Sequence, residues 1–317
     1  MNSLNTPVLF LIFNRPDTTK KVFGQIKKAR PKHLYIAADG PRSHRKNEIE
    51  KCNETREIIK QIDWECELKT LFRKENLGCK YAVSSAISWF FENVEEGIII
   101  EDDCYPDCSF FYYCQELLEK YRYATNVQRI SGSYFDRPGE INWQYSYYFS
   151  YYGHIWGWAT WKRVWNKYDV EMKSYSPATF KKGDFVDIFN FNSEYKYWKS
   201  IFNKVSKKKI DTWDYQLEYS IWCNKGISIN PTKNLVINLG MEDSSTHYFL
   251  KDSMKINLKL NTIKFPLIHP PEINLDKEAD KFTYTNLLRH SFSRILRIIR
   301  ENNIKNIFYY GVNKITK

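Results

Sequence analysis

Short apolar runs alternate with longer segments of mixed polarity over the first hundred residues of this chain. Runs rich in β-branched and aromatic residues are typical of strands buried on both faces of a sheet. Segments with apolar positions three and four residues apart predict helices between them. The predicted strands cover residues 8–13, 33–38, 67–72 and 97–100. Strands and helices in alternation predict an α/β fold with a mostly parallel central sheet flanked by helices.

The predicted helices cover approximately residues 17–28, 46–62, 78–92 and 109–123, with a further strand at 129–132. After Gly132 the pattern becomes irregular. The polar segment 174–209 predicts surface helix and loop. A helix is predicted at 212–224, followed by short strands at 227–229 and 235–239.

The C-terminal segment has a pattern of its own. Apolar residues fall near one face of a predicted helix and basic residues flank them; they are Leu287, Leu288, Phe292, Ile295, Leu296 and Ile299, with Arg289, Arg294, Arg297 and Arg300. A helix of this kind can lie on an anionic membrane surface. It can equally be an ordinary amphipathic helix that packs on the domain. Both interpretations stay open at this level.

Charge and composition narrow the class of partner. The 317 residues carry a formal net charge of +11, and 43% of them are hydrophobic. The positive charge indicates an anionic partner, which includes nucleic acid, phospholipid and phosphorylated substrates. Nucleic acid is not expected, because no helix-turn-helix, zinc-finger or RNA-binding sheet pattern is present.

The sequence also carries an expectation about the compartment. No apolar stretch is long enough for a transmembrane helix, and residues 1–7 lack a basic start and an apolar signal core. The seven cysteines are odd in number and contain no CxxC pair, which favours reduced thiols over disulfides or zinc. We therefore expect a cytoplasmic protein, peripheral on the inner face of the cell membrane through its tail.

Three consecutive acids, Glu101, Asp102 and Asp103, follow the predicted strand 97–100. Three carboxylates there repel one another unless a cation offsets them. Mg²⁺ and Mn²⁺ prefer oxygen ligands and use few carboxylates when phosphates complete their shell. The triplet therefore predicts a metal-bound phosphate, with a solvated acidic turn as the alternative.

Two more polar residues follow predicted strands, Arg15 and Asp39, and parallel strands would bring both to the edge that carries the acids. Neither a GxGxxG nor a GxxxxGK[ST] pattern is present, which argues against a dinucleotide-binding fold and a P-loop.

Aromatic residues make up 17% of the chain and concentrate in residues 145–165. Their flat faces suit sugar rings, although most of them are expected in the core.

Six motifs in order carry a resemblance to a known family: FNRP, AADGPR, NLGCKYAVSSAI, GIIIEDDC, GWATW and WDYQ. Their order resembles that of the GT-A-fold glycosyltransferases. More narrowly, it is similar to bacterial nucleotide-diphospho-sugar transferases of surface-polysaccharide clusters, distant relatives of N-acetylglucosaminyltransferase I. The resemblance spans about residues 7–250. It implies a Rossmann-like GT-A domain over 1–268, with a nucleotide-binding half (1–132), an acceptor-binding half (133–268) and a basic extension at 269–317.

The resemblance assigns roles on the nucleotide side. Arg15 and Asp39 match the positions that hold the uracil of a UDP-sugar, and Lys80 loosely matches a further base contact. A carboxylate can accept the uracil imide proton, and a guanidinium can meet a carbonyl. The plain alternatives are a surface ion pair for Arg15, a turn residue for Asp39 and a solvated Lys80.

The same resemblance assigns the acids and a later loop. Asp103 corresponds to the ligand of Mn²⁺ or Mg²⁺, Asp102 lies near the ribose and Glu101 near the sugar. Thr246 and His247 match a loop that closes on the pyrophosphate, and His247 can instead reach the metal. A polar surface loop is the alternative for that segment.

Asp214 is the expected general base. Inverting transfer needs a carboxylate that takes the proton of the acceptor hydroxyl. A simple N-cap is the alternative for this residue, and Glu218 is the alternative base. The function expected is transfer from a UDP-sugar to a lipid-linked glycan acceptor in the biosynthesis of surface polysaccharide or lipopolysaccharide. A sugar nucleotidyltransferase and a non-catalytic carbohydrate-binding protein are the two other interpretations.

Overall fold

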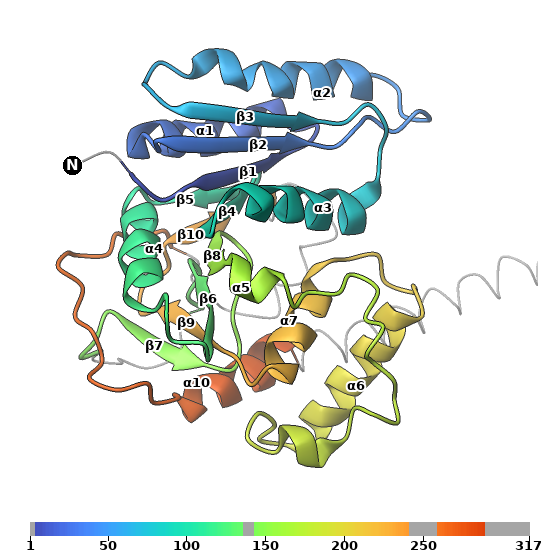
Figure 1. Cartoon of the computed structure of the whole chain (residues 1–317), viewed down its shortest axis with the longest axis vertical. Coiled ribbons are helices and arrows are strands. Elements are labelled where there is room, and N and C mark those ends of the chain that lie inside the picture. The colour runs from blue at the N-terminus through green and yellow to red at the C-terminus, as the bar shows by residue number, and fades with distance from the viewer. Residues whose placement is uncertain (1–3, 136–142, 241–258, 289–317) are drawn as a thin grey trace, which may run out of the picture.

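The computed structural model describes residues 4–135, 143–240 and 259–288, which form an α/β protein built on one eight-stranded sheet (Figure 1). The strand order is β3-β2-β1-β4-β8-β6-β9-β7. The four predicted strands are confirmed as neighbours that pair in parallel: β1 (Val8–Ile12), β2 (His33–Ala38), β3 (Glu67–Phe72) and β4 (Glu96–Glu101). The parallel arrangement that the alternating pattern predicts is therefore confirmed for these strands, and with its flanking helices the fold is Rossmann-like.

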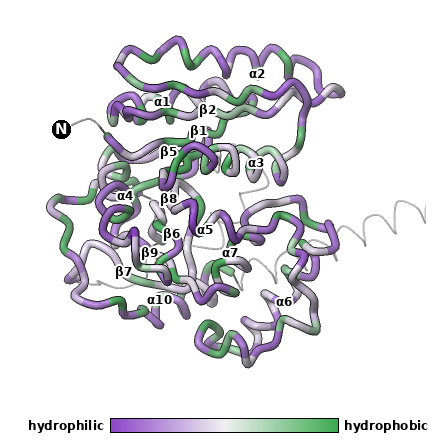
Figure 2. The backbone as a smooth tube through the Cα atoms, viewed as in Figure 1, coloured by the Kyte–Doolittle hydropathy of each residue, from purple (hydrophilic) through white to green (hydrophobic). Residues whose placement is uncertain are grey.

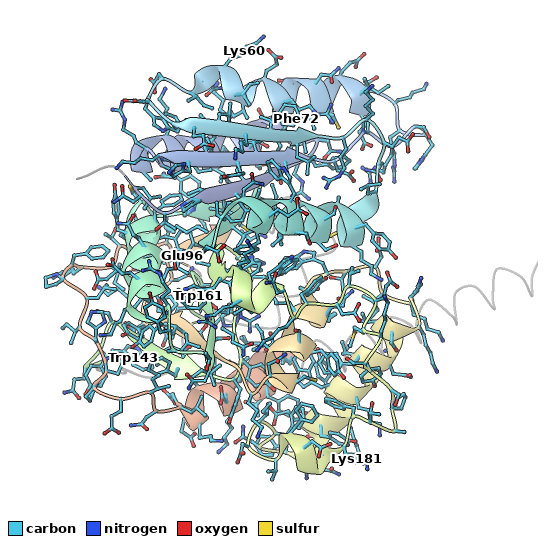
Figure 3. The ribbon with its side chains drawn as sticks, viewed as in Figure 1. Lys60, Phe72, Glu96, Trp143, Trp161 and Lys181 are labelled. Atoms are coloured by element: carbon cyan, nitrogen blue, oxygen red, sulfur yellow. The ribbon has the colours of Figure 1, made fainter. Side chains whose placement is uncertain are left out.

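The other half of the sheet mixes strand directions. Strands β8 (Trp158–Trp161) and β7 (Tyr147–Ser150) run antiparallel to their neighbours, whereas β6 (Val127–Ser131) and β9 (Ile227–Pro231) pair in parallel. Figure 3 labels Glu96 and Trp161, which are register partners on β4 and β8. Sequence patterning did not predict β7 or β8, because both are short and fully or almost fully buried, without an alternating polar face.

A second, two-stranded sheet lies beside the first. Strand β5 (Cys104–Pro106) directly follows the acid triplet and pairs antiparallel with β10 (Val236–Asn238). The predicted strand at 235–239 is therefore confirmed in shortened form. This pairing brings the chain around residue 238 next to the end of β4.

Helices cover the half of the sheet that is formed by β1 to β4. Helix α3 (Gly78–Asn93) packs against β1 and β2, and α4 (Ser109–Lys120) packs against β4, β6 and β8. Helix α1 (Pro16–Ala29) contacts α2 (Glu48–Arg56), which is largely hydrophilic (Figure 2). The single helix predicted at 46–62 is divided, because α2 continues as the 3₁₀ helix η1 (Glu57–Gln61).

The prediction of surface helix and loop for 174–209 is wrong in part. Helix α6 (Asn192–Ser206) buries Trp198 and Phe202, and the rings of Trp198 and Trp222 lie 4.7 Å apart. Trp222 belongs to α7 (Asp214–Cys223). The short helical segments α5 (Lys162–Trp165) and η2 (Lys182–Phe185) complete this region. The segment is polar on average, but its few large aromatic residues, Trp198 and Phe202 among them, are buried and pack against the core.

The described C-terminal residues pack on the end of the sheet. Helix α10 (Lys277–Phe282) continues as the π-helical turn η3 (Thr283–Leu288). Leu287 is buried and Leu288 packs against the core, so the first two members of the predicted apolar stripe contact the protein itself. Residues 289–317 lie outside the described part of the chain, and the division of the chain at residue 268 stays a prediction. Among the described helices, none combines the length and the apolar character needed to cross a bilayer.

Candidate functional site

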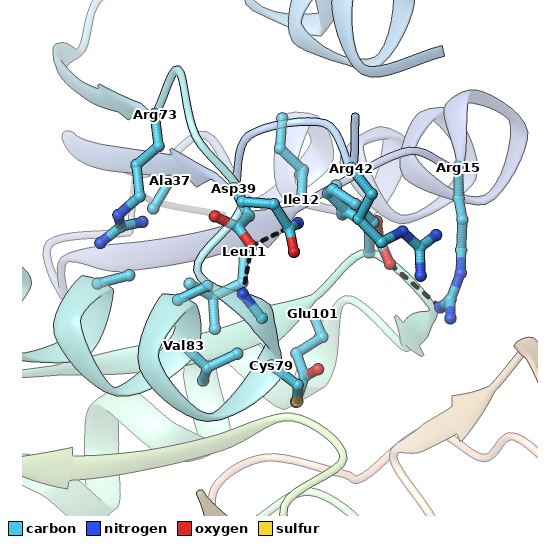
Figure 4. Close-up of a pocket in the computed structure, with 16 residues that line it drawn as sticks. Leu11, Ile12, Arg15, Ala37, Asp39, Arg42, Arg73, Cys79, Val83 and Glu101 are labelled. Carbon is cyan, nitrogen blue, oxygen red and sulfur yellow. Dashed lines mark hydrogen bonds and ion pairs between the residues drawn. The ribbon is translucent and has the colours of Figure 1, made fainter. Parts of the chain in front are cut away.

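A cavity of about 290 Å³ opens where β1, β2 and β4 end beside the start of α3. We call it the edge pocket, and Figure 4 shows its lining. Its walls combine apolar residues with charged and amide groups at the rim; the lining residues are Leu11, Ile12, Phe13, Arg15, Ala37, Asp39, Arg42, Arg73, Asn76, Gly78, Cys79, Ala82, Val83, Ala86, Glu101 and Asp102. The carboxyl ends of parallel strands are where ligands bind in open α/β sheets. The fold therefore brings Arg15, Asp39, Glu101 and Asp102 to one cavity, as the sequence predicted.

Asp39 ties the end of β2 to the start of α3. Its carboxylate accepts hydrogen bonds from the backbone N–H of Leu77 at 3.0 Å and of Gly78 at 3.1 Å, and from the amide of Asn76 at 2.9 Å. A negative charge is favoured at a helix N-terminus, where backbone N–H groups lack partners. Asp39 thus shapes the pocket wall and presents a carboxylate in it.

The acid triplet lies at the end of β4, at the other side of the pocket. Asp102 accepts a hydrogen bond from the backbone N–H of Phe13 at 3.0 Å, which joins β4 to the end of β1. Burial raises the pKa of Glu101 to about 8, and the nearby charges of Asp103, Asp102 and Asp214 add to the shift. Burial likewise raises the pKa of Asp102 to about 7, although Arg15 acts in the opposite direction. Burial therefore favours the protonated form of both carboxyl groups, and a cation bound beside them would favour the ionised form.

Arg15 is the counterion of these acids. Its Nη1 donates to Asp103 Oδ2 at 2.6 Å and lies 3.4 Å from Asp102 Oδ1. In Figure 4 Arg15 and Arg73 lie at opposite ends of the pocket lining, with Asp39 between them. The two residues that the resemblance assigns to one base, Arg15 and Asp39, are thus held by different partners.

Oxygen atoms suited to a hard cation gather beside Asp103. Asn238 is the last residue of β10, and its Oδ1 is buried without a hydrogen-bond partner among the described residues. A Cβ placed on Gly240 would lie 3.0 Å from Asp103 Oδ2 and 3.1 Å from Asn238 Oδ1, so both oxygens face the same space. No group of three or more His, Cys, Asp or Glu residues with metal-binding geometry occurs in the described residues. A carboxylate plus one neutral oxygen fits Mg²⁺ or Mn²⁺ when phosphates complete the shell.

Asp214 is the first residue of α7. Trp213 occupies the N-cap position and stacks on Trp158 at 5.7 Å between ring centroids, so Asp214 is not the N-cap. Its carboxylate accepts a hydrogen bond from Thr212 Oγ1. Burial raises the pKa of Asp214, and its charge in turn raises the pKa of Glu101. A second carboxyl group is therefore within electrostatic reach of Glu101 at this end of the sheet.

Glu218, the alternative base, forms a buried ion pair with Arg129. Its Oε2 lies 2.7 Å from Arg129 Nη2, and the two side chains are 8% and 1% exposed. Arg129 also donates to Ser228 Oγ at 3.1 Å. A buried ion pair of this kind leaves Glu218 in a structural role.

Lys80 faces away from the edge pocket and is not among its lining residues. Its Nζ lies 3.1 Å from Glu171 Oε1, and the side chain is 7% exposed. The hydroxyl of Tyr81 donates to the same carboxylate, and this bond and Lys80 lower the pKa of Glu171 to about 2. Lys80 is therefore paired in the interior and does not line the edge pocket, so the geometry gives the loose match at this position no support.

Several lining residues were missed by the sequence analysis. Arg73 follows the end of β3 and donates to Ser85 Oγ at 2.7 Å, and burial lowers its pKa. Asn76 holds Asp39, and Arg42 is occupied by the carboxylate of Glu48. The rule that located Asp39, a polar residue directly after a strand, also applies to Arg73. Thr246 and His247 lie outside the described residues, so their predicted roles stay predictions.

Comparison with known proteins adds little to this geometry. No protein-family model and no curated protein sequence matches the chain. Among solved structures, the crystal structure of HddC from Yersinia pseudotuberculosis is similar over 51% of this chain and 80% of its own, with 13% identity and a TM-score of 0.32. A similarity of that extent does not bear on the activity of this chain. The interpretation of the site therefore rests on the residues described above.

Proposed function

We propose that this protein is a metal-dependent glycosyltransferase that moves a sugar from a UDP-sugar to a glycan acceptor. One observation carries the proposal: the edge pocket is lined by Glu101 and Asp102 of the acid triplet, and Asp214 lies within electrostatic reach of Glu101. A nucleotide site, an excess of carboxylates and a separate carboxyl base are the three parts that such a transfer needs. The order of the six sequence motifs points to the same chemistry.

The edge pocket suits a pyrimidine nucleotide. Apolar side chains such as Leu11 and Val83 line its interior, and Asp39 and Arg73 offer an acceptor and a donor to the edges of a base. A uracil imide proton would bond to a carboxylate, and a guanidinium would bond to a carbonyl oxygen. Arg15, at the opposite end of the lining beside the acids, is better placed for the diphosphate than for the base.

Asp103 would hold the divalent cation beside the diphosphate, with Mn²⁺ or Mg²⁺ as the ion. Bound there, the cation supplies positive charge that stabilises the leaving UDP. Asp102, which accepts a hydrogen bond from the backbone N–H of Phe13, would lie near the ribose, and Glu101 would lie near the sugar. These assignments extend the family resemblance residue by residue.

Asp214 would act as the general base. In this step its carboxylate takes the proton of an acceptor hydroxyl while the hydroxyl oxygen attacks the anomeric carbon. The bond from that carbon to the diphosphate oxygen breaks, UDP leaves, and the configuration inverts. The raised pKa of Asp214 suits a base that must hold a proton and then release it.

The glycan acceptor is proposed to bind beside a cluster of aromatic rings near the acid triplet. Phe135, His154 and Trp156 form a cluster of partly exposed rings, with 4.5 Å between Phe135 and His154 and 5.5 Å between Phe135 and Trp156. They flank β6 and β8 where these strands meet the end of β4. Flat rings of this kind can stack on sugar. A lipid-linked glycan would agree with a basic tail that meets an anionic membrane.

The test is a thermal-shift comparison of nucleotides and nucleotide-sugars with and without Mn²⁺. We expect UDP and one UDP-sugar to raise the melting temperature only with the cation, because a ligand that binds the folded state stabilises it. Asp103→Ala should abolish this shift and the transfer while the protein stays folded. A shift that survives in the presence of a chelator would contradict the metal assignment.

The same screen separates the two other interpretations. A sugar nucleotidyltransferase would respond to a nucleoside triphosphate and a sugar phosphate, and it would release pyrophosphate. A carbohydrate-binding protein would respond to a glycan alone, without nucleotide or cation. Transfer from a UDP-sugar, detected as released UDP, is the result that distinguishes the glycosyltransferase.

The membrane part of the proposal has its own experiment. The full chain should sediment with anionic liposomes, and a chain that ends at Leu288, which keeps the buried Leu287, should remain in solution. High salt should weaken binding only in part, because burial of apolar residues is not screened. If the full chain ignores anionic liposomes at low salt, the tail has another role.

A further inference from the structure

Backbone hydrogen bonds hold the chain around Asn238 against Asp103, the proposed cation ligand. Asn238 pairs with Cys104 in the β10–β5 ladder, and Cys104 directly follows Asp103. The backbone N–H of Leu239 donates to the carbonyl oxygen of Asp103 at 2.7 Å. These bonds fix the end of β10 against the last acid of the triplet.

Within the described part of the chain, no hydrogen-bond donor reaches the amide oxygen of Asn238. Asn238 Oδ1 is buried and accepts no hydrogen bond from the described residues. Leaving a buried acceptor unsatisfied costs about 1–3 kcal/mol, so an orphaned oxygen at a binding site calls for an occupant. The same atom faces the space beside Gly240 that Asp103 Oδ2 also faces, at 3.1 Å and 3.0 Å from the position of a Cβ there.

We propose that Asn238 Oδ1 is a second protein ligand of the divalent cation held by Asp103. The inference rests on the proposed function and adds to it a residue from a different part of the chain. Amide and carboxylate oxygens are the ligands that Mg²⁺ and Mn²⁺ accept, and two of them leave positions for the oxygens of a diphosphate. Glycine at position 240 keeps that space open, because a side chain there would come against both oxygens.

The cation must replace Arg15 at one of these atoms. Arg15 Nη1 donates to Asp103 Oδ2, and its side chain is 52% exposed. An exposed ion pair contributes little to stability, so Arg15 can leave Asp103 at a small cost. A guanidinium freed in this way remains beside the place where a diphosphate would lie.

The test measures binding of Mn²⁺ itself, by the loss of the free-ion signal in electron paramagnetic resonance during titration, with and without UDP. We expect Asn238→Ala to weaken Mn²⁺ binding by roughly tenfold or more, a change that even outer-shell substitutions of metal sites produce. Asn238→Asp should keep or tighten binding, because it retains an oxygen at the same place and adds charge.

Asn230→Ala is the matched control. Asn230 lies in β9, its Oδ1 is also buried without a partner among the described residues, and its amide nitrogen donates to the carbonyl of Tyr152. Because β9 pairs with β6 and β7 and not with β4 or β5, this variant should change thermal stability and leave Mn²⁺ affinity unaltered.

The outcomes separate this inference from the proposed function. Wild-type Mn²⁺ affinity in both Asn238→Ala and Asn238→Asp, with loss of binding in Asp103→Ala, would overturn the role of Asn238 alone. Unchanged binding in Asp103→Ala would overturn the metal site as a whole. If Asn238→Ala does not fold, Asn238→Asp decides the matter, because weaker binding in that variant would contradict a ligand oxygen at this position.

Discussion

Two arginine–carboxylate clusters lie on opposite sides of β4, and they differ in how far water reaches them. Arg15 follows β1 and meets Asp102 and Asp103 with a side chain that is 52% exposed. Arg129 lies in β6 and meets Glu218 with a side chain that is 1% exposed. Both are short contacts, at 2.6 Å and 2.7 Å, so distance alone does not distinguish them.

The two clusters differ in the balance of their charges and in their burial. At the pocket rim one arginine serves a triplet of acids, and the pKa values of Glu101 and Asp102 are raised by burial and, in part, by mutual repulsion. In the interior, Arg129 is matched by Glu218 and held by Ser228, and a side chain at Gly153 would collide with its guanidinium. The first cluster therefore has three acids for one arginine, whereas the second pairs one arginine with one carboxylate in the interior and joins β6 to α7.

The largest expected effect tests whether Asp214 is the general base of the proposed transfer. Asp214→Asn should reduce turnover by roughly 10²–10⁴, which is typical of the loss of a general base, with little change in donor affinity. Steady-state kinetics and UDP binding measure the two quantities. Ser220→Ala, on the same helix, is the control, because its hydroxyl bonds only to the carbonyl of Lys167 among the described residues. Weak donor binding at normal turnover would give Asp214 a structural or donor-site role.

Removing each arginine in turn sharpens the comparison directly. Arg129→Met leaves the carboxylate of Glu218 buried without its partner and should lower the free energy of unfolding by about 3–5 kcal/mol. Arg15→Met should change it by less than about 1 kcal/mol, because the Arg15 side chain is 52% exposed and water screens its contacts with the less exposed Asp102 and Asp103. Urea denaturation at neutral pH measures both values. Equal losses in the two variants would mean that exposure does not decide the role of the cluster.

Asp280 extends the comparison to a buried acid without an arginine. It is fully buried, it accepts hydrogen bonds from Ser150 Oγ and from the backbone N–H of Tyr151, and its Oδ2 has no partner among the described residues. Burial raises its pKa from 3.8 to about 7. The folded state therefore binds this proton more tightly than the unfolded state does.

The stabilising contribution of that proton is complete below the unfolded pKa of 3.8 and is lost as the pH rises to about 7. Asp280→Asn keeps the shape without the charge, so its free energy of unfolding should exceed that of the wild type by about 2–4 kcal/mol at about pH 8. At low pH the two proteins should be alike. Denaturation midpoints over this range test the prediction, and parallel curves for the two proteins would contradict it.

The smallest expected effect concerns the competition between Arg15 and Mn²⁺ for the carboxylate of Asp103. In the absence of nucleotide, Arg15→Met should tighten Mn²⁺ binding by a factor of up to about five, because a surface ion pair is worth at most about 1 kcal/mol. Titration of Mn²⁺ measures the change. Weaker binding in this variant would mean that Arg15 supports the cation site instead of competing for it.

Local pattern predicted the half of the fold that contains β1 to β4 well. The bounds of β2 and β3 agree with the prediction, and those of β1 and β4 agree within one residue at each end, because β-branched and apolar runs between turn residues mark such strands. The same pattern failed for β7, β8 and most of α6. There, single aromatic rings supply the packing, and their partners are distant in the sequence, as with Trp198 and Trp222.

The sequence by itself determined which residues stand at the ends of the parallel strands. It therefore located Arg15, Asp39 and the acid triplet on one edge, since strand direction alone decides which edge a following residue reaches. Only the tertiary structure decided how these charges are shared. It gave Arg15 to the acids, Asp39 to the start of α3, Lys80 to Glu171 and Glu218 to Arg129, and it brought Asn238 beside Asp103. Each of these pairings depends on burial and on distances between segments far apart in the chain, which no local pattern records.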